Sequence, residues 1–123
     1  MATKAISLTG EMLPFAGVIR VEVSKHFNVD SNGNLVLFFP RDYNEEKVFD
    51  DERRIKELRY IGTEVFTFGY LNGKLGMVRY DYGDGQRDEI FLNYVDGKLT
   101  TILNAGKIYR LQYDKDGEIR GAN

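Results

Sequence analysis

Hydrophobic side chains alternate with polar ones in three short segments of the C-terminal half. The segments read EVFTFGY, DEIFLNY and KIYRLQY, and they end at Tyr70, Tyr94 and Tyr113. In each segment, apolar or aromatic residues occupy every second position, which places their side chains on one face of a β-strand. The pattern therefore predicts three strands that each contribute one face to a hydrophobic core.

A tight turn follows each of these segments. The turns read LNG, VDG and DKDG, and Lys-Leu, Lys-Leu or Glu-Ile comes next. Asn-Gly and Asp-Gly supply the positive φ angles that short hairpin turns require. We therefore predict that one hairpin unit is repeated over residues 54–123 and forms an antiparallel meander of roughly six or seven strands.

Two further strands are predicted before this meander. The segment VIRVEV at 18–23 alternates, with Ile19, Val21 and Val23 on one side and Arg20 and Glu22 on the other. The segment NLVLFF at 34–39 is apolar enough to be buried on both faces. The polar stretch at 41–53 predicts one short helix or a polar loop. Residues 50–60 fit either a helix capped by Asp50 or another strand, and the repeat favours the strand. The predicted fold is an all-β or nearly all-β single domain spanning residues 1–123, with a twisted antiparallel meander.

Some aromatic and apolar residues do not fit the core pattern and are candidates for binding. Tyr43, Tyr60, Tyr80 and Tyr82 fall outside the core register and predict an exposed aromatic patch, because a tyrosine tip tolerates water. Phe91 lies on the second face of the sheet, which is more apolar than a solvated face should be. Residues 1–17, with Met12, Leu13 and Phe15, predict an N-terminal arm that contacts the sheet or a partner.

Composition excludes several classes of protein. The chain has 17 basic and 19 acidic residues without a basic cluster, which argues against nucleic acid as a partner. There are no cysteines, so thiolate catalysis, disulfides and cysteine zinc sites are excluded. No apolar run approaches a membrane span, and the first residues do not resemble a signal peptide. The localisation stays open, between synthesis without Sec export and a trimmed secreted form.

No catalytic, metal or cofactor site is predicted. His26 is the only histidine, and no partner for it is apparent in the sequence. The acidic residues between 45 and 52 are interpreted as a solvated surface, although a carboxylate enzyme site at 42–52 stays an alternative. DSNGN at 30–34 and DKDGE at 114–118 lack the spacing of a calcium-binding EF-hand loop and are explained by turns.

The stretches FTFGYLNGKL, FLNYVDGKL and RLQYDKDGEI resemble YD-type hairpin repeats, as in RHS-like bacterial surface and toxin-carrier proteins. They are also similar to repeats of small secreted β-sheet proteins of gut bacteria. Tyr113-Asp114 with Gly117 and Ile119 matches the repeat best, whereas Leu71 and Val95 replace the Asp in the other two units. The resemblance covers at most residues 54–123. It implies a hairpin fold with a binding or scaffolding role and no catalytic residues.

These observations together predict a non-catalytic structural or protein-binding module. We expect a protein partner or self-assembly, such as a subunit of a phage particle or of a surface complex. The alternative is a carbohydrate-binding module that uses exposed tyrosines.

Overall fold

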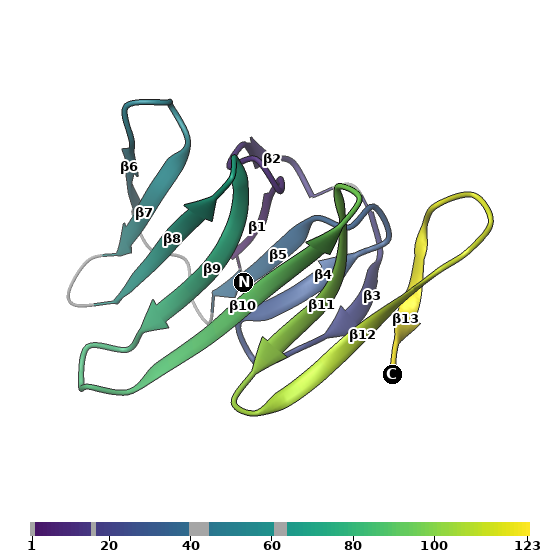
Figure 1. Cartoon of the computed structure of the whole chain (residues 1–123). Coiled ribbons are helices and arrows are strands. Elements are labelled where there is room, and N and C mark those ends of the chain that lie inside the picture. Colours follow the sequence, from purple (N-terminus) through teal and green to yellow (C-terminus); the bar gives the residue numbers. More distant parts are fainter. Residues whose placement is uncertain (1, 16, 40–44, 61–63) are drawn as a thin grey trace.

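The structure of the chain is a computed structural model that describes residues 2–15, 17–39, 45–60 and 64–123. Two antiparallel sheets pack face to face (Figure 1), and no helix occurs in these residues. The prediction of an all-β fold is confirmed. The described part of the chain contains no helix long and apolar enough to cross a membrane.

The first sheet contains the N-terminal third of the chain, in the strand order β2-β1-β5-β4-β3. Its strands are β1 (Ala2–Ile6), β2 (Met12–Leu13), β3 (Ile19–Glu22), β4 (Phe27–Asp30) and β5 (Leu35–Phe39). Within the predicted N-terminal arm, residues 2–6 and 12–13 are strands of this sheet, because β1 pairs with β5 over five residues and with β2 on its other side. Ala5 and Ile6 are buried, so this segment belongs to the core of the fold.

The second sheet is a meander of eight strands in sequence order, from β6 to β13. Its strands are β6 (Glu45–Phe49), β7 (Ile55–Tyr60), β8 (Val65–Leu71), β9 (Lys74–Asp81), β10 (Arg87–Val95), β11 (Lys98–Asn104), β12 (Lys107–Tyr113) and β13 (Ile119–Ala122). The hairpin-repeat sheet is thus confirmed, and it begins at residue 45 instead of 54. The strand interpretation of residues 55–60 is also confirmed.

The expected helix or polar loop near 41–53 is wrong for residues 45–49, which form the edge strand β6. Glu46 and Lys47 are exposed there, and an edge strand tolerates charges that would be costly inside a sheet. Residues 50–53 form the turn to β7, and residues 40–44 lie outside the described part.

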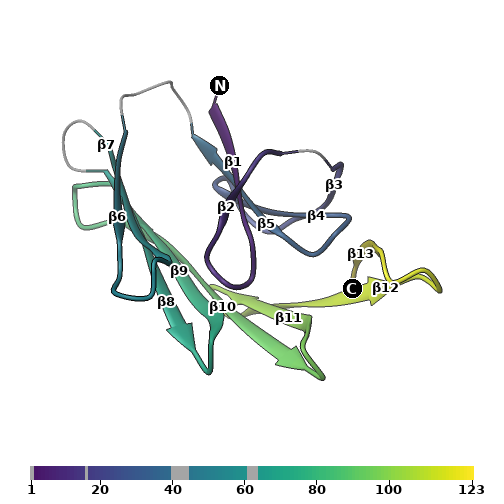
Figure 2. The ribbon, with the colours of Figure 1, turned by 90° about the horizontal axis from the view of Figure 1, so that it is seen from above.

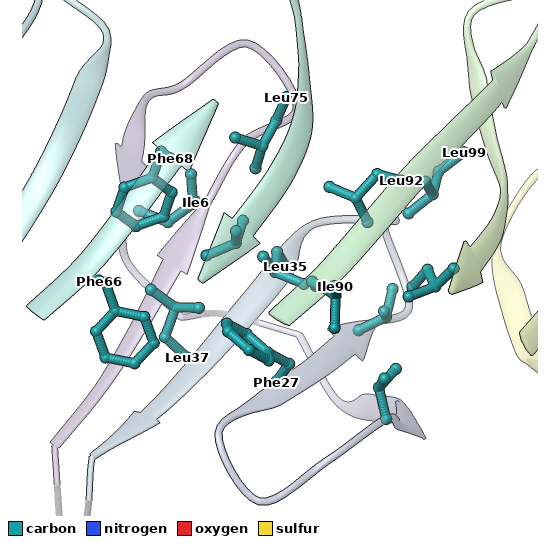
Figure 3. Close-up of a cluster of buried hydrophobic side chains, with 14 of the residues drawn as sticks. Ile6, Phe27, Leu35, Leu37, Phe66, Phe68, Leu75, Ile90, Leu92 and Leu99 are labelled. Carbon is teal, nitrogen blue, oxygen red and sulfur yellow. The ribbon is translucent and has the colours of Figure 1, made fainter. Parts of the chain in front are cut away.

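The two sheets share one hydrophobic core. Figure 2 shows the large sheet curving around the small one, which lies on its concave side. Side chains from the two sheets point toward each other in Figure 3, with Ile6, Phe27 and Leu37 from the small sheet near Phe66 and Ile90 from the large one. All five are fully buried. The face of the large sheet that points away from this core is therefore the face left to solvent.

A recurring tyrosine contact explains why the hairpin sequence repeats. The hydroxyl groups of Tyr70, Tyr94 and Tyr113 each donate a hydrogen bond to a backbone carbonyl in the hairpin before their own. The acceptors are Ile55 at 2.6 Å, Leu75 at 2.6 Å and Leu99 at 2.5 Å. Each tyrosine therefore fixes its hairpin to the preceding one.

The residue before each acceptor carries a positive charge that lies over the same tyrosine ring. The guanidinium carbon of Arg54 is 4.2 Å from the ring centre of Tyr70, and the Lys98 amine is 5.0 Å from that of Tyr113. Lys74 lies 5.7 Å from the ring centre of Tyr94. A cation over an aromatic face is an attractive contact. The repeated Lys-Leu of one hairpin and the Tyr of the next thus contact each other, through the lysine over the ring and the hydroxyl on the leucine carbonyl.

Each hairpin of the repeat also contains a β-bulge at the same place. Tyr70 pairs with Leu75, but its neighbour Gly69 pairs with Met77, so Gly76 is one residue too many in β9. The register shifts in the same way before Tyr94 and Tyr113 and before Phe49 of the first hairpin. A bulge of this kind reverses which residues face the core beyond it.

The tip of the β1–β2 hairpin connects the small sheet to the large one. The backbone N–H groups of Ile55 and Leu75 donate to the carbonyls of Gly10 and Leu8, at 3.1 and 2.7 Å. Gly10 has a φ of +94° and lies directly against the Tyr70 side chain. A side chain at position 10 would collide with that tyrosine.

Candidate functional site

An apolar stripe crosses the solvent-facing side of the large sheet. The stripe consists of Met77, Phe91, Leu103 and Ile108. Phe91 is paired with Met77 on one side and with Leu103 on the other, and Leu103 is paired with Ile108. The exposed fractions of Phe91, Leu103 and Ile108 are 43%, 36% and 44%. Four consecutive strands, β9 to β12, thus place an apolar residue at the same level of the open face.

A hollow lies on each side of Phe91 along β10. The first is bounded by Phe91 and Leu103, with Arg87, Glu89 and the β11–β12 turn at its end. The second has a volume of about 410 Å³ and lies between Phe91 and the exposed Leu71, where Gly76 has no side chain to fill the space. Phe91 is therefore a ridge between two depressions, an arrangement that can receive protruding side chains of a partner.

The polar groups around the apolar stripe differ on its two sides. Toward the β9–β10 turn, Arg79 contacts Asp81 at 3.1 Å and Glu89 at 3.9 Å, and Arg87 contacts Asp81 at 3.8 Å. Toward the β10–β11 turn lies a polar row across three strands, in which Asn93 is paired with Thr101 and Thr101 with Arg110. An apolar centre with a polar surround is typical of protein interfaces.

The predicted aromatic patch is not assembled as expected. Tyr80 is only 2% exposed and packs against Phe66, with ring centres 4.5 Å apart. Tyr82 is half-buried, and its hydroxyl lies 3.3 Å from Nδ1 of His26. The expected exposure of Tyr80 is therefore wrong, and Tyr82 is only partly exposed. The bulge at Gly76 is the reason, because it turns Val78 and Tyr80 toward the core.

The remaining candidate residues are placed as follows. Phe91 lies on the open face, as its position in the sequence predicted. Tyr43 lies outside the described residues, and Tyr60 ends strand β7 with a side chain outside the described part. Met12 packs against the core and Leu13 is half-buried, while Phe15 is 39% exposed beyond β2. The structure therefore separates Phe15 from the apolar stripe, which lies on the other sheet.

A partly buried polar cluster joins the two sheets at one end of the core. The Ser24 hydroxyl donates to Oδ2 of Asp88 at 2.5 Å, and Nδ1 of His26 lies 3.4 Å from the same oxygen. The Asn104 side chain donates to the other Asp88 oxygen at 3.0 Å. Burial opposes ionisation of Asp88, but these hydrogen bonds outweigh it and hold the pKa of its carboxyl below the usual range. Sequence reasoning missed this cluster, because Asp88 is more than 60 residues away from Ser24 and His26.

The cluster does not have the geometry of a nucleophilic site. In a Ser-His-Asp triad, histidine lies between the other two residues and accepts the serine proton. Here Ser24 and His26 both contact Asp88 instead, and His26 is only 2% exposed. The arrangement satisfies buried polar groups and holds the two sheets together.

The acidic turns use their carboxylates to cap the backbone. Asp30, Asp50 and Asp114 each accept two backbone N–H bonds at 2.9 Å from residues two and four positions ahead. These bonds, first among them the bond from the Arg54 backbone, hold the pKa of Asp50 below its usual range. Among the residues that the structure describes, no three His, Asp or Glu side chains form a group that could hold a metal ion.

Comparison of the sequence with models of known protein families, with curated protein sequences and with solved structures finds no match in any of the three. The resemblance to YD-type repeats therefore stays a prediction.

Proposed function

We propose that this chain is a non-catalytic protein-binding module, a subunit of a larger assembly, and that its contact surface is the apolar stripe. The observation that carries the proposal is the register of Met77, Phe91, Leu103 and Ile108 across four strands of the open face. On this surface apolar residues replace the polar ones expected on the solvated face of an antiparallel sheet. A phage particle or a surface complex is an assembly of the kind we propose.

The two hollows support a contact with another protein. Ridges and depressions around a large aromatic residue are the places where a few partner side chains supply most of the binding energy. The stripe is small beside the roughly 800 Å² per partner of a stable interface. We therefore expect Phe91 and its neighbours to form the centre of a larger contact with a polar rim.

Site-specific photocrosslinking in cells that express the chain tests the proposal. A photoreactive phenylalanine derivative at position 91 preserves the shape of Phe91, and the same group at Phe49 serves as the control. Phe49 is 51% exposed but lies on edge strand β6, away from the stripe. A discrete crosslinked protein that depends on position 91, and that disappears when Leu103→Lys is added, supports the proposal. Equal crosslinking at both positions contradicts it.

Carbohydrate binding is the second candidate function. Because Tyr80 is buried, Phe91 is the aromatic residue that would contact a sugar. Phe91 forms one wall of the 410 Å³ hollow, and Asn72 and Asn93, which carry amide side chains, are also among its lining residues. An aromatic face with nearby amide groups suits a sugar ring. Binding to a glycan panel that is lost in Phe91→Ala, without the crosslinked protein, favours this function over the first.

A further inference from the structure

The sequence contains two Asn-Gly pairs, Asn32–Gly33 and Asn72–Gly73, which the fold places in very different surroundings. An asparagine followed by glycine can cyclise, because the glycine backbone nitrogen can reach the asparagine side-chain carbonyl carbon without a Cβ in the way. The reaction needs a backbone that can move and a nitrogen that is not held elsewhere. The structure decides which of the two pairs meets these conditions.

Asn32–Gly33 is held on several sides. The N–H of Asn32 donates to Oδ1 of Asp30 at 2.9 Å, and the N–H of Gly33 donates to the Asp30 carbonyl at 3.2 Å. Gly33 is buried, with Cδ1 of Ile119 only 3.7 Å from the position of a Cβ. The Ser31 carbonyl also accepts the N–H of Ile119 at 2.9 Å. Cyclisation at Asn32 would require this whole contact to open.

Asn72–Gly73 is the free tip of the β8–β9 hairpin. Both residues are exposed, and apart from Gly73 and its two chain neighbours, no heavy atom of the described residues lies within 4 Å of the position of a Gly73 Cβ. In the described part of the chain, the hydrogen bonds of the turns include none from the N–H of Gly73. Asn72 has a φ of +53°, the left-handed conformation that asparagine adopts more readily than most other residues with a side chain. The nitrogen is thus accessible, and the turn that must move is only two residues long.

We propose that Asn72 is a site of spontaneous deamidation in the folded protein. The Gly73 nitrogen attacks Cγ of Asn72 and loses its proton, and the Cγ–Nδ2 bond breaks to release ammonia. Water then opens the resulting five-membered imide at either carbonyl. The products are aspartate and isoaspartate at position 72, and no oxidant, reductant or enzyme is needed.

The two products differ in their effect on the sheet. Aspartate fits, because Asp96–Gly97 forms the equivalent turn of the next hairpin with φ angles of +52° and +78°, against +53° and +78° at Asn72–Gly73. Isoaspartate adds a methylene group to the backbone of a two-residue turn. The pairing of Leu71 with Lys74 cannot then be kept, and Leu71 and Lys74 both line the hollow beside Phe91.

Peptide mapping by mass spectrometry tests the proposal on the full chain. Trypsin places the two Asn-Gly pairs on separate peptides, residues 26–41 and 60–74. After incubation of the folded protein at mildly alkaline pH, we expect the peptide with Asn72 to gain one mass unit at least roughly tenfold faster than the peptide with Asn32, since Asn32 must wait for local unfolding. Two chromatographic products, aspartate and isoaspartate, are expected at position 72.

The same incubation in concentrated urea is the control. There the fold no longer protects either pair, and the two rates should become similar. Gly73→Ala should slow the reaction at Asn72 and leave Asn32 unchanged. The proposal is overturned if Asn72 stays as intact as Asn32 in the folded protein, or if the ratio of the two rates is the same with and without urea.

Discussion

Replacing Gly10 by alanine should destabilise the fold far more than the same change at any exposed turn glycine. A Cβ at position 10 would lie 2.9 Å from Cζ of Tyr70 and 2.9 Å from Cβ of Arg54, and it would overlap the Tyr70 hydroxyl oxygen. Tyr70 cannot simply swing away, because its hydroxyl donates to the Ile55 carbonyl and its ring lies under the Arg54 guanidinium.

Three costs contribute to the expected loss. Alanine at a φ of +94° is strained by about 1–2 kcal/mol. Forcing a methyl group into a packed contact costs about 1–3 kcal/mol. If Tyr70 moves, the partly buried Ile55 carbonyl loses its hydroxyl donor, at about 1–3 kcal/mol. We therefore expect the free energy of unfolding to fall by at least about 3 kcal/mol, and the melting temperature to fall by roughly 10 °C or more.

Gly85→Ala is the matched control for Gly10→Ala. Gly85 has a φ of +88° in a turn of the same length, and no atom lies within 4 Å of its Cβ position. It should therefore show only the backbone strain of about 1–2 kcal/mol. Urea unfolding followed by circular dichroism measures both variants. Equal losses in the two variants would refute the contact argument.

A double-mutant cycle with Tyr70→Phe identifies the colliding atom. Tyr70→Phe removes the hydroxyl oxygen that the new methyl group would overlap, and it also removes the hydrogen bond to Ile55. Gly10→Ala should therefore cost less in the Tyr70→Phe background than in the wild type. Strictly additive losses would show that the two side chains do not meet.

Three further outcomes are expected. Ala105→Asn should raise the free energy of unfolding by about 0.5–1 kcal/mol, because Ala105 has a φ of +50° at the turn position that Asn72 occupies in its own hairpin. Urea titration measures the change, and an unchanged midpoint would contradict the prediction. The pKa of Asp88 is lowered in the folded protein, so its contribution to stability is present above about pH 4 and is lost as the pH falls through the folded pKa. The difference in free energy of unfolding between wild type and Asp88→Asn should therefore be smaller at about pH 3 than at about pH 7. Burial raises the pKa of Tyr70 to about 12 and also raises the pKa of Tyr94, so the free energy of unfolding should fall as the pH rises above about 10. Absorbance titration of Tyr94→Phe should show one late-ionising tyrosine fewer than the wild type.

The strands of the repeat could be predicted because their signals are local. Period-two alternation and the Asn-Gly and Asp-Gly turns lie within about ten residues of each other in every unit. Strand β6 could not be identified in this way, because Glu45, Glu46 and Lys47 hide the pattern. An edge strand has one side without a neighbour, and charged side chains there are common.

The candidate site could be predicted only in part, because strict alternation fails at each bulge. Phe91 precedes the bulge of its hairpin, and it lies on the open face as alternation predicts. Tyr80 follows the bulge at Gly76, which turns it toward the core, so its predicted exposure is wrong. The contact of Asp88 with Ser24 and His26 joins two sheets that are distant in sequence, and such a contact has no local signal.

The tyrosine links between hairpins all point in one direction along the chain. Tyr70, Tyr94 and Tyr113 donate to carbonyls that lie earlier in the sequence. In the first hairpin, Phe49 occupies the position equivalent to these tyrosines and has no hydroxyl. Among the described residues, no hairpin of the large sheet precedes it. During synthesis from the N-terminus, each tyrosine would thus emerge after its acceptor. The chain is suited to build its large sheet one hairpin at a time on the ribosome, each new hairpin docking onto one already in place.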